Sequence, residues 1–296
     1  MADLRFGLVG TGYWAAETHA PAIAATPGIR LESVWGRRAE AAEQLASRHG
    51  ATGFTDVDAF LQTVDAVAFA APPHVQSGLA VRAAEAGKHL LLEKPIAVSE
   101  AEAERVVTAV ERVGVASVVF HTILFDPRIR AIVEGRPEEG WSGGQGLWLG
   151  SALRDDNPFN TPWRHDKGAL WDLGPHAISV LWATLGPIVD ATATRGDRDL
   201  VHAVLRHASG ATSTTSMTLQ ASDAADGFST LLWGEMGRQA LPVDDVDEGE
   251  ALRTALAELR DLIVTGGTEH ASDARFGRDV VAVLARLEAS LGEDAS

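Results

Sequence analysis

The sequence predicts an α/β protein with an N-terminal, doubly wound Rossmann domain and a C-terminal α+β domain whose open sheet is mostly antiparallel. Three observations lead to this expectation. Short apolar runs alternate with longer amphipathic runs over the first 120 residues, a Gly-rich turn follows the first apolar run, and the pattern changes after Asp126-Pro127. Strand–helix alternation with near-continuous apolar strands is typical of a parallel sheet covered on both faces.

The elements of the first part follow from the apolar runs and from the residues that stop them. Strands are expected over residues 4–9, 30–35, 65–70, 89–92 and 115–120. Helices are expected over residues 13–25, 39–48, 75–86 and 100–113. Ser99 is the expected cap of the last helix, and Gly50, Gly87 and Gly114 each follow a predicted helix, where glycine is a common stop signal.

The second part is expected to be organised differently. Residues 135–146 are rich in Gly, Glu and Pro and indicate a loop, while residues 154–168 are polar and irregular. Strands are expected over residues 147–153, 188–195, 200–207, 211–220 and 228–233, and helices over residues 168–185, 249–265 and 273–290. We therefore expect domains at residues 1–122 and 123–296, with the C-terminal helix free to pack back on the first domain.

The composition restricts the partners. The formal net charge of −16 disfavours nucleic acid and anionic membranes as partners, because both carry negative charge. The absence of cysteine excludes disulfides, thiolate metal sites and cysteine nucleophiles. No stretch reaches the ~20 apolar residues of a membrane span, and the N-terminus lacks a signal-peptide pattern. A cytoplasmic enzyme that acts on a small molecule is the resulting expectation.

The Gly-rich turn predicts a dinucleotide site. It fits G-x-G-x-x-A and lies between the first predicted strand and the first predicted helix, which is the required context. Gly10 permits a tight turn, Gly12 leaves room for a pyrophosphate, and Ala15 lets the helix pack closely on the sheet. The expected cofactor-binding residues of this turn are Gly10, Thr11, Gly12, Tyr13, Trp14 and Ala15. The alternative is a Gly-rich turn that binds nothing.

The end of the second strand predicts which dinucleotide binds. NAD enzymes usually carry Asp or Glu about 20 residues after the fingerprint, where it bonds the ribose 2′-hydroxyl. This chain has Gly36, Arg37 and Arg38 there, and Glu32 lies too early, inside the strand. Because arginine pairs well with a 2′-phosphate, we expect NADP(H) in preference to NAD(H). Solvated arginines at a helix start are the alternative interpretation.

Two further segments carry candidate acid–base groups. Lys94 follows the fourth predicted strand, and ligands of doubly wound folds bind at the carboxyl ends of strands. Asp172 and His176 are spaced i, i+4, which puts both on one side of a helix, and histidine exchanges protons near neutral pH. A surface lysine and a polar pair that caps a helix are the alternatives. A metal pair is another, but His165 and Asp166 supply no recognised third-ligand spacing, so no metal is expected.

Together these residues resemble the glucose–fructose oxidoreductase/inositol dehydrogenase (Gfo/Idh/MocA) family over nearly the whole chain. The resemblance rests on four segments in order: residues 7–15, Ala-Pro-Pro-His at 71–74, the segment 86–95 that ends in Glu-Lys-Pro, and Gly-x-x-x-Asp-x-Gly-x-His at 168–176. It implies a Rossmann domain followed by an α/β domain whose open sheet forms a homodimer or homotetramer. It also implies that Lys94, Asp172 and His176 form the catalytic group.

The resemblance implies further contacts with cofactor and substrate. The residues implied near the nicotinamide are Pro72, His74, Glu93 and Lys94, and Trp163-Arg164 resembles a segment that approaches both ligands. We expect residues 151–164 to line the substrate pocket. The candidate substrate contacts are Arg154, Asn157 and Arg164, with His121 across from them. Hydrogen bonds that only stabilise the loop are the alternative for these side chains.

The expected activity is that of an NAD(P)-dependent dehydrogenase. A hydride would pass reversibly between nicotinamide C4 and a secondary alcohol or ketone carbon of a sugar, cyclitol or similar polyhydroxylated molecule. In this hypothesis His176 exchanges the hydroxyl proton, Lys94 stabilises charge on the oxygen, and Asp172 orients the substrate or His176. Two alternatives are a non-catalytic dinucleotide-binding regulator and a reductase of an imine or carbonyl intermediate, because a fold alone does not determine function.

Overall fold

The computed structural model describes residues 3–136, 140–155 and 157–293. Residues 137–139 of the expected loop 135–146, and residue 156 of the expected pocket segment, lie outside the described residues. The chain forms two compact units, Met1–Phe120 with Asp247–Asp279, and His121–Val246 with Val280–Ser296. The first unit thus ends close to the boundary expected at residue 122, but it also includes residues 247–279.

The first unit is built on a six-stranded parallel sheet with the order β3-β2-β1-β4-β5-β6. Its strands are β1 (Leu4–Val9), β2 (Ile29–Trp35), β3 (Thr52–Phe54), β4 (Ala66–Phe69), β5 (His89–Glu93) and β6 (Ser117–Phe120). The four residues of β4 and of β6 are all buried, as near-continuous apolar strands of a doubly covered sheet should be. The strand order reverses between β1 and β4, and doubly wound folds bind their ligands at such a point.

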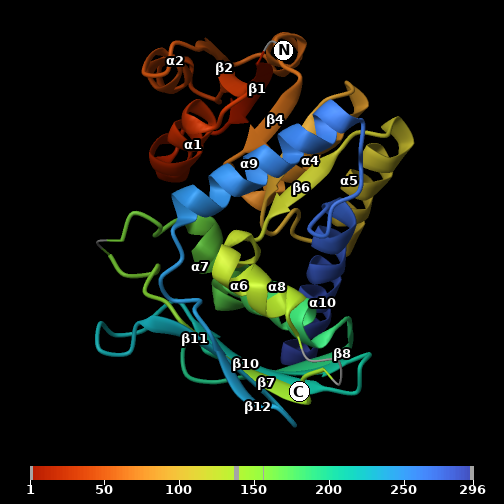
Figure 1. Ribbon diagram of the computed structural model, residues 1–296. Coiled ribbons are helices and arrows are strands. Elements are labelled where there is room, and N and C mark those ends of the chain that lie inside the picture. Colours follow the sequence, from red (N-terminus) through yellow and green to blue (C-terminus); the bar gives the residue numbers. More distant parts are fainter. Residues whose placement is uncertain (1–2, 137–139, 156, 294–296) are drawn as a thin grey trace. The chain divides into compact units, whose positions relative to one another are not determined.

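Helices cover both faces of this sheet. They are η1 (Ala15–His19), α1 (Ala20–Ala25), α2 (Ala39–Ser47), α3 (Val57–Gln62), α4 (Pro73–Glu85), α5 (Glu100–Val113) and α9 (Glu248–Thr265). Helix α4 packs against α5 and β5, whereas α9, from much later in the sequence, packs against η1, α1, β5 and β6 (Figure 1). The predicted cap Ser99 accepts a hydrogen bond from the Glu102 N–H, and Gly114 ends α5 with a positive φ.

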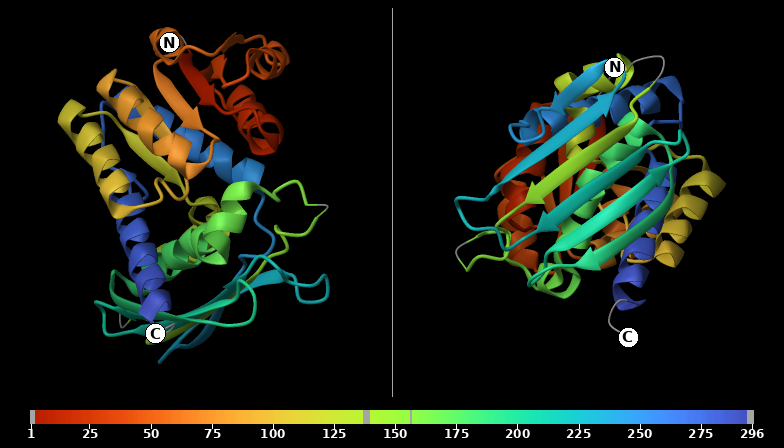
Figure 2. Two further views of the ribbon diagram at one scale, coloured as in Figure 1. Left: turned by 180° about the vertical axis from the view of Figure 1, so that it is seen from behind. Right: turned by 90° about the horizontal axis from the view of Figure 1, so that it is seen from below.

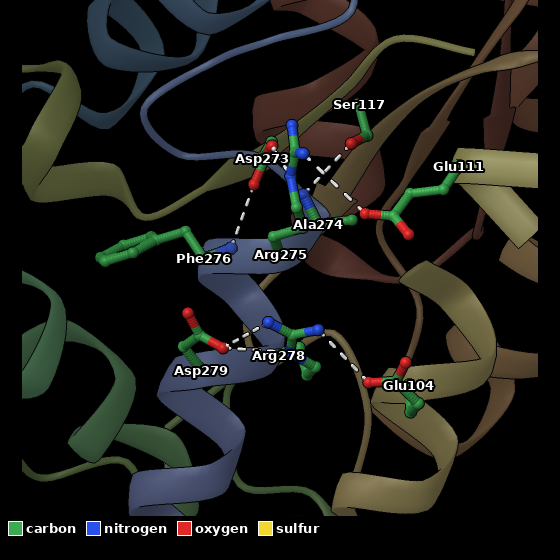
Figure 3. Close-up of polar contacts among 9 residues, drawn as sticks. All are labelled: Glu104, Glu111, Ser117, Asp273, Ala274, Arg275, Phe276, Arg278 and Asp279. Atoms are coloured by element: carbon green, nitrogen blue, oxygen red, sulfur yellow. Dashed lines mark hydrogen bonds and ion pairs between the residues drawn. The ribbon is translucent and has the colours of Figure 1, made fainter. Parts of the chain in front are cut away.

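The start of α10 (Ala274–Glu293) is fastened to the first unit by polar contacts (Figure 3). The Ser117 hydroxyl on β6 accepts the Ala274 N–H at 3.1 Å. Arg275 and Arg278 are ion-paired with Glu111 and Glu104 of α5 at 3.8 and 3.3 Å. These contacts explain why residues that follow the second sheet in sequence belong to the first unit.

The second unit holds a six-stranded mixed sheet with the order β12-β11-β7-β10-β9-β8. Its strands are β7 (Gly143–Leu149), β8 (Ile188–Arg195), β9 (Val201–His207), β10 (Thr212–Thr218), β11 (Gly227–Gly234) and β12 (Gly237–Leu241). All neighbouring strands are antiparallel except β10 and β7. Burial alternates along β9, which is typical of a sheet with one covered and one open face.

The helices of this unit are η2 (Thr122–Phe125), α6 (Pro127–Glu134), α7 (Pro162–Asp172) and α8 (Gly174–Leu185), together with the later residues of α10. Helix α8 packs against β7 and β10. Among the described residues no helix of this unit lies over the opposite face, where the strands are seen uncovered in Figure 2 (right). The predicted fold class is therefore confirmed, including the mostly antiparallel second sheet.

Several elements differ from the sequence-based expectation. The short elements β3, α3, α6 and β12 were not predicted, and β7 begins at Gly143, within the expected loop. The helix expected over 168–185 is divided at Leu173 into α7 and α8, and α7 begins earlier, at Pro162, with a kink at Gly168, whose φ is +66°. Within the described ranges, no helix is both long enough and apolar enough to cross a membrane.

Candidate active site

Four predicted site segments lie at the same end of the first sheet. Because the strands are parallel, the residues after β1, β2, β4 and β5 all emerge at their carboxyl ends. These residues are the Gly10–Ala15 turn, Gly36 to Arg38, Pro72 with His74, and Glu93 with Lys94. Segments up to about 80 residues apart in the sequence are therefore brought to one end of one sheet.

The Gly-rich turn has a geometry that fits a dinucleotide. Gly10 has φ +130°, and a Cβ there would lie 2.3 Å from the Ala70 carbonyl oxygen, so only glycine fits. A Cβ at Gly12 would meet no heavy atom within 4 Å, so the space beside this backbone is open for a close approach. Ala15 is fully buried, as close helix–sheet packing requires. Tyr13 is more than half exposed beside this turn.

The segment after β2 combines a constrained glycine with two exposed arginines. The Gly36 N–H donates to the Phe54 carbonyl oxygen at 3.0 Å, and a Cβ at Gly36 would lie 2.6 Å from Thr11 Cγ2. Arg37 and Arg38 are exposed, and neither has an ion pair with any described residue. Their guanidinium groups are thus available to an anion.

Glu93 and Lys94 are held at the end of β5 by α4. The Gln76 side chain accepts the Glu93 N–H at 2.8 Å and donates to the Glu93 carbonyl oxygen at 2.7 Å. Lys94 is partly exposed, and its peptide bond to Pro95 is cis. Sequence reasoning missed Gln76; its position in the first turn of a helix after Pro72-Pro73 was the available signal.

The Glu93 carboxyl lies in a buried, polar environment. Its Oε1 accepts the Trp14 indole N–H at 2.7 Å, and its Oε2 accepts the Lys94 backbone N–H at 3.1 Å. Burial raises the pKa of Glu93 to about 7, although the charge of Lys94 and the hydrogen bond from Trp14 act in the opposite direction. Pro72 and His74, which precede and begin α4, are both exposed.

In the second unit, Asp172 is ion-paired with Arg164. The guanidinium donates from Nε at 2.6 Å and from Nη2 at 3.2 Å to the two carboxylate oxygens, which is a bidentate arrangement. Arg164 is itself fixed, because Nη1 donates to the Phe159 carbonyl oxygen at 3.1 Å and the guanidinium lies over the rings of Phe159 and Trp163. The structure thus gives Asp172 a cationic partner that the i, i+4 spacing with His176 did not predict.

His176 lies in the first turn of α8 and packs on the second sheet. Its ring stacks on that of Trp148 on β7, with centroids 6.0 Å apart and planes 10° from parallel. Trp148 in turn contacts Phe228 on β11, with centroids 5.2 Å apart. Two strands distant in sequence therefore set the orientation of the imidazole, and sequence reasoning missed both aromatic residues.

The remaining candidates take part in loop structure. Arg154 is ion-paired with Asp223. The Asn157 side chain donates to the Ser151 carbonyl oxygen at 3.2 Å and accepts the Phe159 N–H at 2.8 Å. His121 is buried directly before η2. These contacts match the loop-stabilising alternative, while a role in substrate binding stays a prediction.

The catalytic group predicted from the sequence is divided between the units. Lys94 belongs to the first unit, and Asp172 and His176 belong to the second. Their convergence beside one cofactor stays a prediction. Within the described part of the chain, no group of three or more His, Asp or Glu residues is arranged to hold a metal ion.

Comparison with known families matches both units. Residues 4–121 match the family model described as "Oxidoreductase family, NAD-binding Rossmann fold". Residues 144–239 match the model of the "GFO/IDH/MocA C-terminal domain". The first model covers the segment that forms the first sheet, and the second model covers most of the segment that forms the second sheet.

Individual relatives agree with these matches. Levoglucosan dehydrogenase of Pseudarthrobacter phenanthrenivorans is 30% identical over 267 residues, which cover 83% of this chain and 63% of that protein. 4-Carboxy-2-hydroxymuconate-6-semialdehyde dehydrogenase of Sphingobium sp. is 28% identical, with 65% and 62% covered. The chain therefore spans less than two thirds of the length of these relatives. The solved structure of UDP-N-acetylglucosamine 3-dehydrogenase from Acidithiobacillus ferrooxidans shares the fold, with a TM-score of 0.83, 20% identity and 99% of both chains covered.

Proposed function

The chain belongs to the Gfo/Idh/MocA family of oxidoreductases, and on this premise we propose that it is an NAD(P)-dependent dehydrogenase of polyhydroxylated small molecules. Its reaction interconverts a secondary alcohol and a ketone on a sugar, a cyclitol or a similar compound. The observation that carries the proposal is the placement of Glu93-Lys94 and the Gly10–Ala15 turn at the same end of the first sheet. The relationship to a levoglucosan dehydrogenase supports a sugar-like substrate.

The dinucleotide fits the residues that are present. The open space beside Gly12 and the tight turn at Gly10 provide room for a pyrophosphate. The nicotinamide, when bound, supplies or accepts the hydride. Pro72, His74 and Glu93 lie at the adjoining strand ends and hold the nicotinamide end in this proposal.

The chain's own side chains handle the proton and the charge. His176, oriented by its stacking on Trp148, takes the hydroxyl proton during oxidation and returns it during reduction. Lys94 stabilises the negative charge that develops on the same oxygen. Asp172 is held by Arg164 and positions the substrate or the imidazole. Trp163, Arg164, Arg154, Asn157 and His121 are the proposed contacts around the substrate.

The proposal is tested by a panel of sugars, cyclitols and their keto forms, with absorbance at 340 nm as the readout. At least one member should be turned over by the wild-type chain, and Lys94→Ala should lose that activity while it still binds the cofactor. Cofactor binding without turnover of any member would support the non-catalytic regulator. An imine added to the panel tests the remaining alternative, and turnover of the imine alone would support an imine reductase.

We further propose NADP(H) as the preferred cofactor. Arg37 and Arg38 are exposed at the end of β2 and lie where a 2′-phosphate is recognised in this fold. Glu32 supports this preference, because it lies within β2 and is ion-paired with Arg30 at 2.7 Å. Arg37→Ala and Arg38→Ala should each weaken NADPH binding about tenfold, the loss of a charge-assisted hydrogen bond, and leave NADH binding unchanged. Fluorescence titration of both cofactors measures this; equal losses for NADH would contradict the preference.

We also propose that the open face of the second sheet forms a homodimer or homotetramer. Leu147 and Val204 are exposed apolar residues on this face, about 40–50% accessible. An uncovered sheet face that carries exposed apolar side chains supports an interface at this face. Val204→Asp should lower the mass measured by light scattering, while Val113→Asp, at an equally exposed apolar site on α5, should not. A wild-type chain that is monomeric at micromolar concentration would contradict this proposal.

A further inference from the structure

A buried histidine lies directly behind the Gly-rich turn. Residues Ala15–His19 form a π-helical turn, and such turns occur frequently at functional sites. The turn ends at His19, whose ring is 1% exposed. The ring packs edge-on against Trp14, at 6.0 Å between centroids, and against Phe120 on β6, at 6.4 Å. An ionisable side chain this deep beside a ligand-binding turn requires an explanation, because an apolar residue would pack there without a desolvation penalty.

The Glu93 carboxyl lies close to this ring. His19 Nε2 lies 3.4 Å from Glu93 Oε1, the same oxygen that accepts the Trp14 indole N–H. Neither ring nitrogen of His19 makes a well-aligned hydrogen bond to any residue in the described ranges. The carboxyl thus has one indole N–H, one backbone N–H and one imidazole around it, and the Gln76 side chain fixes the backbone that carries it.

Charges around the pair determine how many protons it holds. Burial lowers the pKa of His19 to about 4, although the nearby backbone of Trp14 and Phe69 favours its charged form. Burial raises the pKa of Glu93 to about 7. The charged groups that act on Glu93 are Lys94 on its own strand end and Glu248 at the start of α9. Since burial lowers the pKa of His19 and raises that of Glu93, the imidazole stays neutral and only Glu93 changes charge near neutral pH.

We propose that His19 is a positioning residue whose neutral imidazole donates Nε2–H toward Glu93, so that this carboxyl becomes a single-proton switch for the charge beside Lys94. The assignment rests on the proposed function, because it gives the pair a role next to a catalytic lysine. With Glu93 ionised, a negative charge lies beside Lys94 and partly offsets its positive charge. With Glu93 protonated, the net charge at this strand end is one unit more positive, and the affinity and rate that depend on this charge change with it.

The first test needs no turnover. In the cofactor-free full chain, with labelled histidine and glutamate, NMR should show His19 as a neutral Nε2–H tautomer from pH 8 to pH 5. The Glu93 carboxyl carbon should titrate near pH 7. His19→Phe removes the imidazole N–H that lies near Glu93 Oε1 and should shift the Glu93 titration upward by roughly half a pH unit, less than the worth of a well-aligned hydrogen bond to a charged group.

Two matched variants keep the test decisive. His19→Gln places an amide N–H near the position of Nε2 and should return the Glu93 titration most of the way to its wild-type value. If His19→Phe does not fold, His19→Gln is compared with the wild-type chain in its place. His270→Gln removes another His–Glu pair of the same unit, that with Glu258 at 3.0 Å, and should leave the Glu93 titration unchanged. A His19 ring that protonates near the ordinary pKa of ~6.5, or a Glu93 titration that ignores both His19 variants, would overturn the proposal.

A second readout applies once a substrate is known. The acid limb of the kcat/KM profile should move with the Glu93 titration in His19→Phe and return in His19→Gln. A purely structural role for His19 would lower activity at all pH values without moving the limb. If the chain turns over no polyol but the NMR titrations behave as expected, the proposed function fails and the proton switch stands.

Discussion

Glu93 in the first unit and Asp172 in the second are both buried carboxyls, but their partners differ in charge. Glu93 accepts hydrogen bonds from neutral N–H groups of Trp14 and the backbone. Asp172 is held by the guanidinium of Arg164 through two hydrogen bonds. Neutral donors only partly offset the cost of burying a carboxylate, whereas an adjacent cation offsets much more of it. One carboxyl is therefore suited to exchange a proton, and the other is suited to keep a fixed charge in place.

The largest expected effect concerns the second unit, which holds Asp172 and His176. His176→Ala removes the proposed proton acceptor and should reduce turnover by about 10²–10⁴-fold, with cofactor affinity nearly unchanged. Steady-state kinetics and a cofactor titration measure the two quantities separately. His49→Ala, two residues after the end of α2 in the first unit, is the control. Full activity of the His176 variant would remove this residue from the mechanism.

The second effect tests whether Arg164 compensates the buried charge. Arg164→Ala should lower the free energy of unfolding by about 3–5 kcal/mol, because it removes the bidentate guanidinium partner of the buried Asp172 carboxylate. Adding Asp172→Asn should recover part of that loss. Arg112→Ala breaks an exposed pair with Glu85 and should cost less than about 1 kcal/mol. Urea unfolding measures both variants. If Arg164→Ala and Arg112→Ala lowered the free energy of unfolding equally, burial of the Arg164–Asp172 pair would not increase its contribution to stability.

The smallest effect is a pH dependence that distinguishes two kinds of carboxyl. The folded pKa of Glu93 is raised, so its stabilising contribution is complete below the unfolded pKa of 4.5 and is lost as pH rises through about 7. Relative to Glu93→Gln, the wild-type chain should therefore lose stability between pH 5 and pH 8, by up to a few kcal/mol.

Asp126 provides the matched case of opposite sign. The hydrogen bonds and charge of Arg128 hold the pKa of Asp126 below its ordinary value of 3.8. Its contribution is present above that value and is lost as pH falls through the lower folded pKa. Asp126→Asn should thus be destabilising at pH 5 to 8 by a constant amount, about 1 kcal/mol, because the Arg128 side chain is 44% exposed and solvent screens the pair. Urea unfolding at several pH values compares both variants, and parallel pH profiles would contradict the contrast.

The first unit was the more predictable from sequence. Buried parallel strands appear as apolar runs, and Gly114 and Ser99 mark the ends of α5 with the geometry that their residue types favour. The strand β3 was missed because its three residues are not fully buried, so they carry no apolar signal. The π-helical turn Ala15–His19 was missed because its sequence has the same periodicity as an ordinary helix.

Partners of the candidate residues were less predictable. The spacing of Asp172 and His176 suggested a pair on one helix, but the turn at Gly168 brings Arg164 back to Asp172. The stacking of Trp148 on His176 depends on the register of β7, which no local pattern specifies. Residue types at strand ends were thus predictable, while the contacts that tune them depend on segments distant in sequence.

The close approach of Gly36 to Thr11 has a consequence for how this protein can evolve or be redesigned. An NAD-type carboxylate introduced at position 36 would bring a Cβ to 2.6 Å from Thr11 Cγ2, and the stiff, β-branched threonine has little freedom to turn away. If the proposed preference for NADP(H) holds, its conversion to NAD(H) through Gly36→Asp therefore depends on an earlier or simultaneous Thr11→Ser or Thr11→Gly. The two positions are epistatic: the order in which the substitutions arise decides whether the route passes through a folded intermediate.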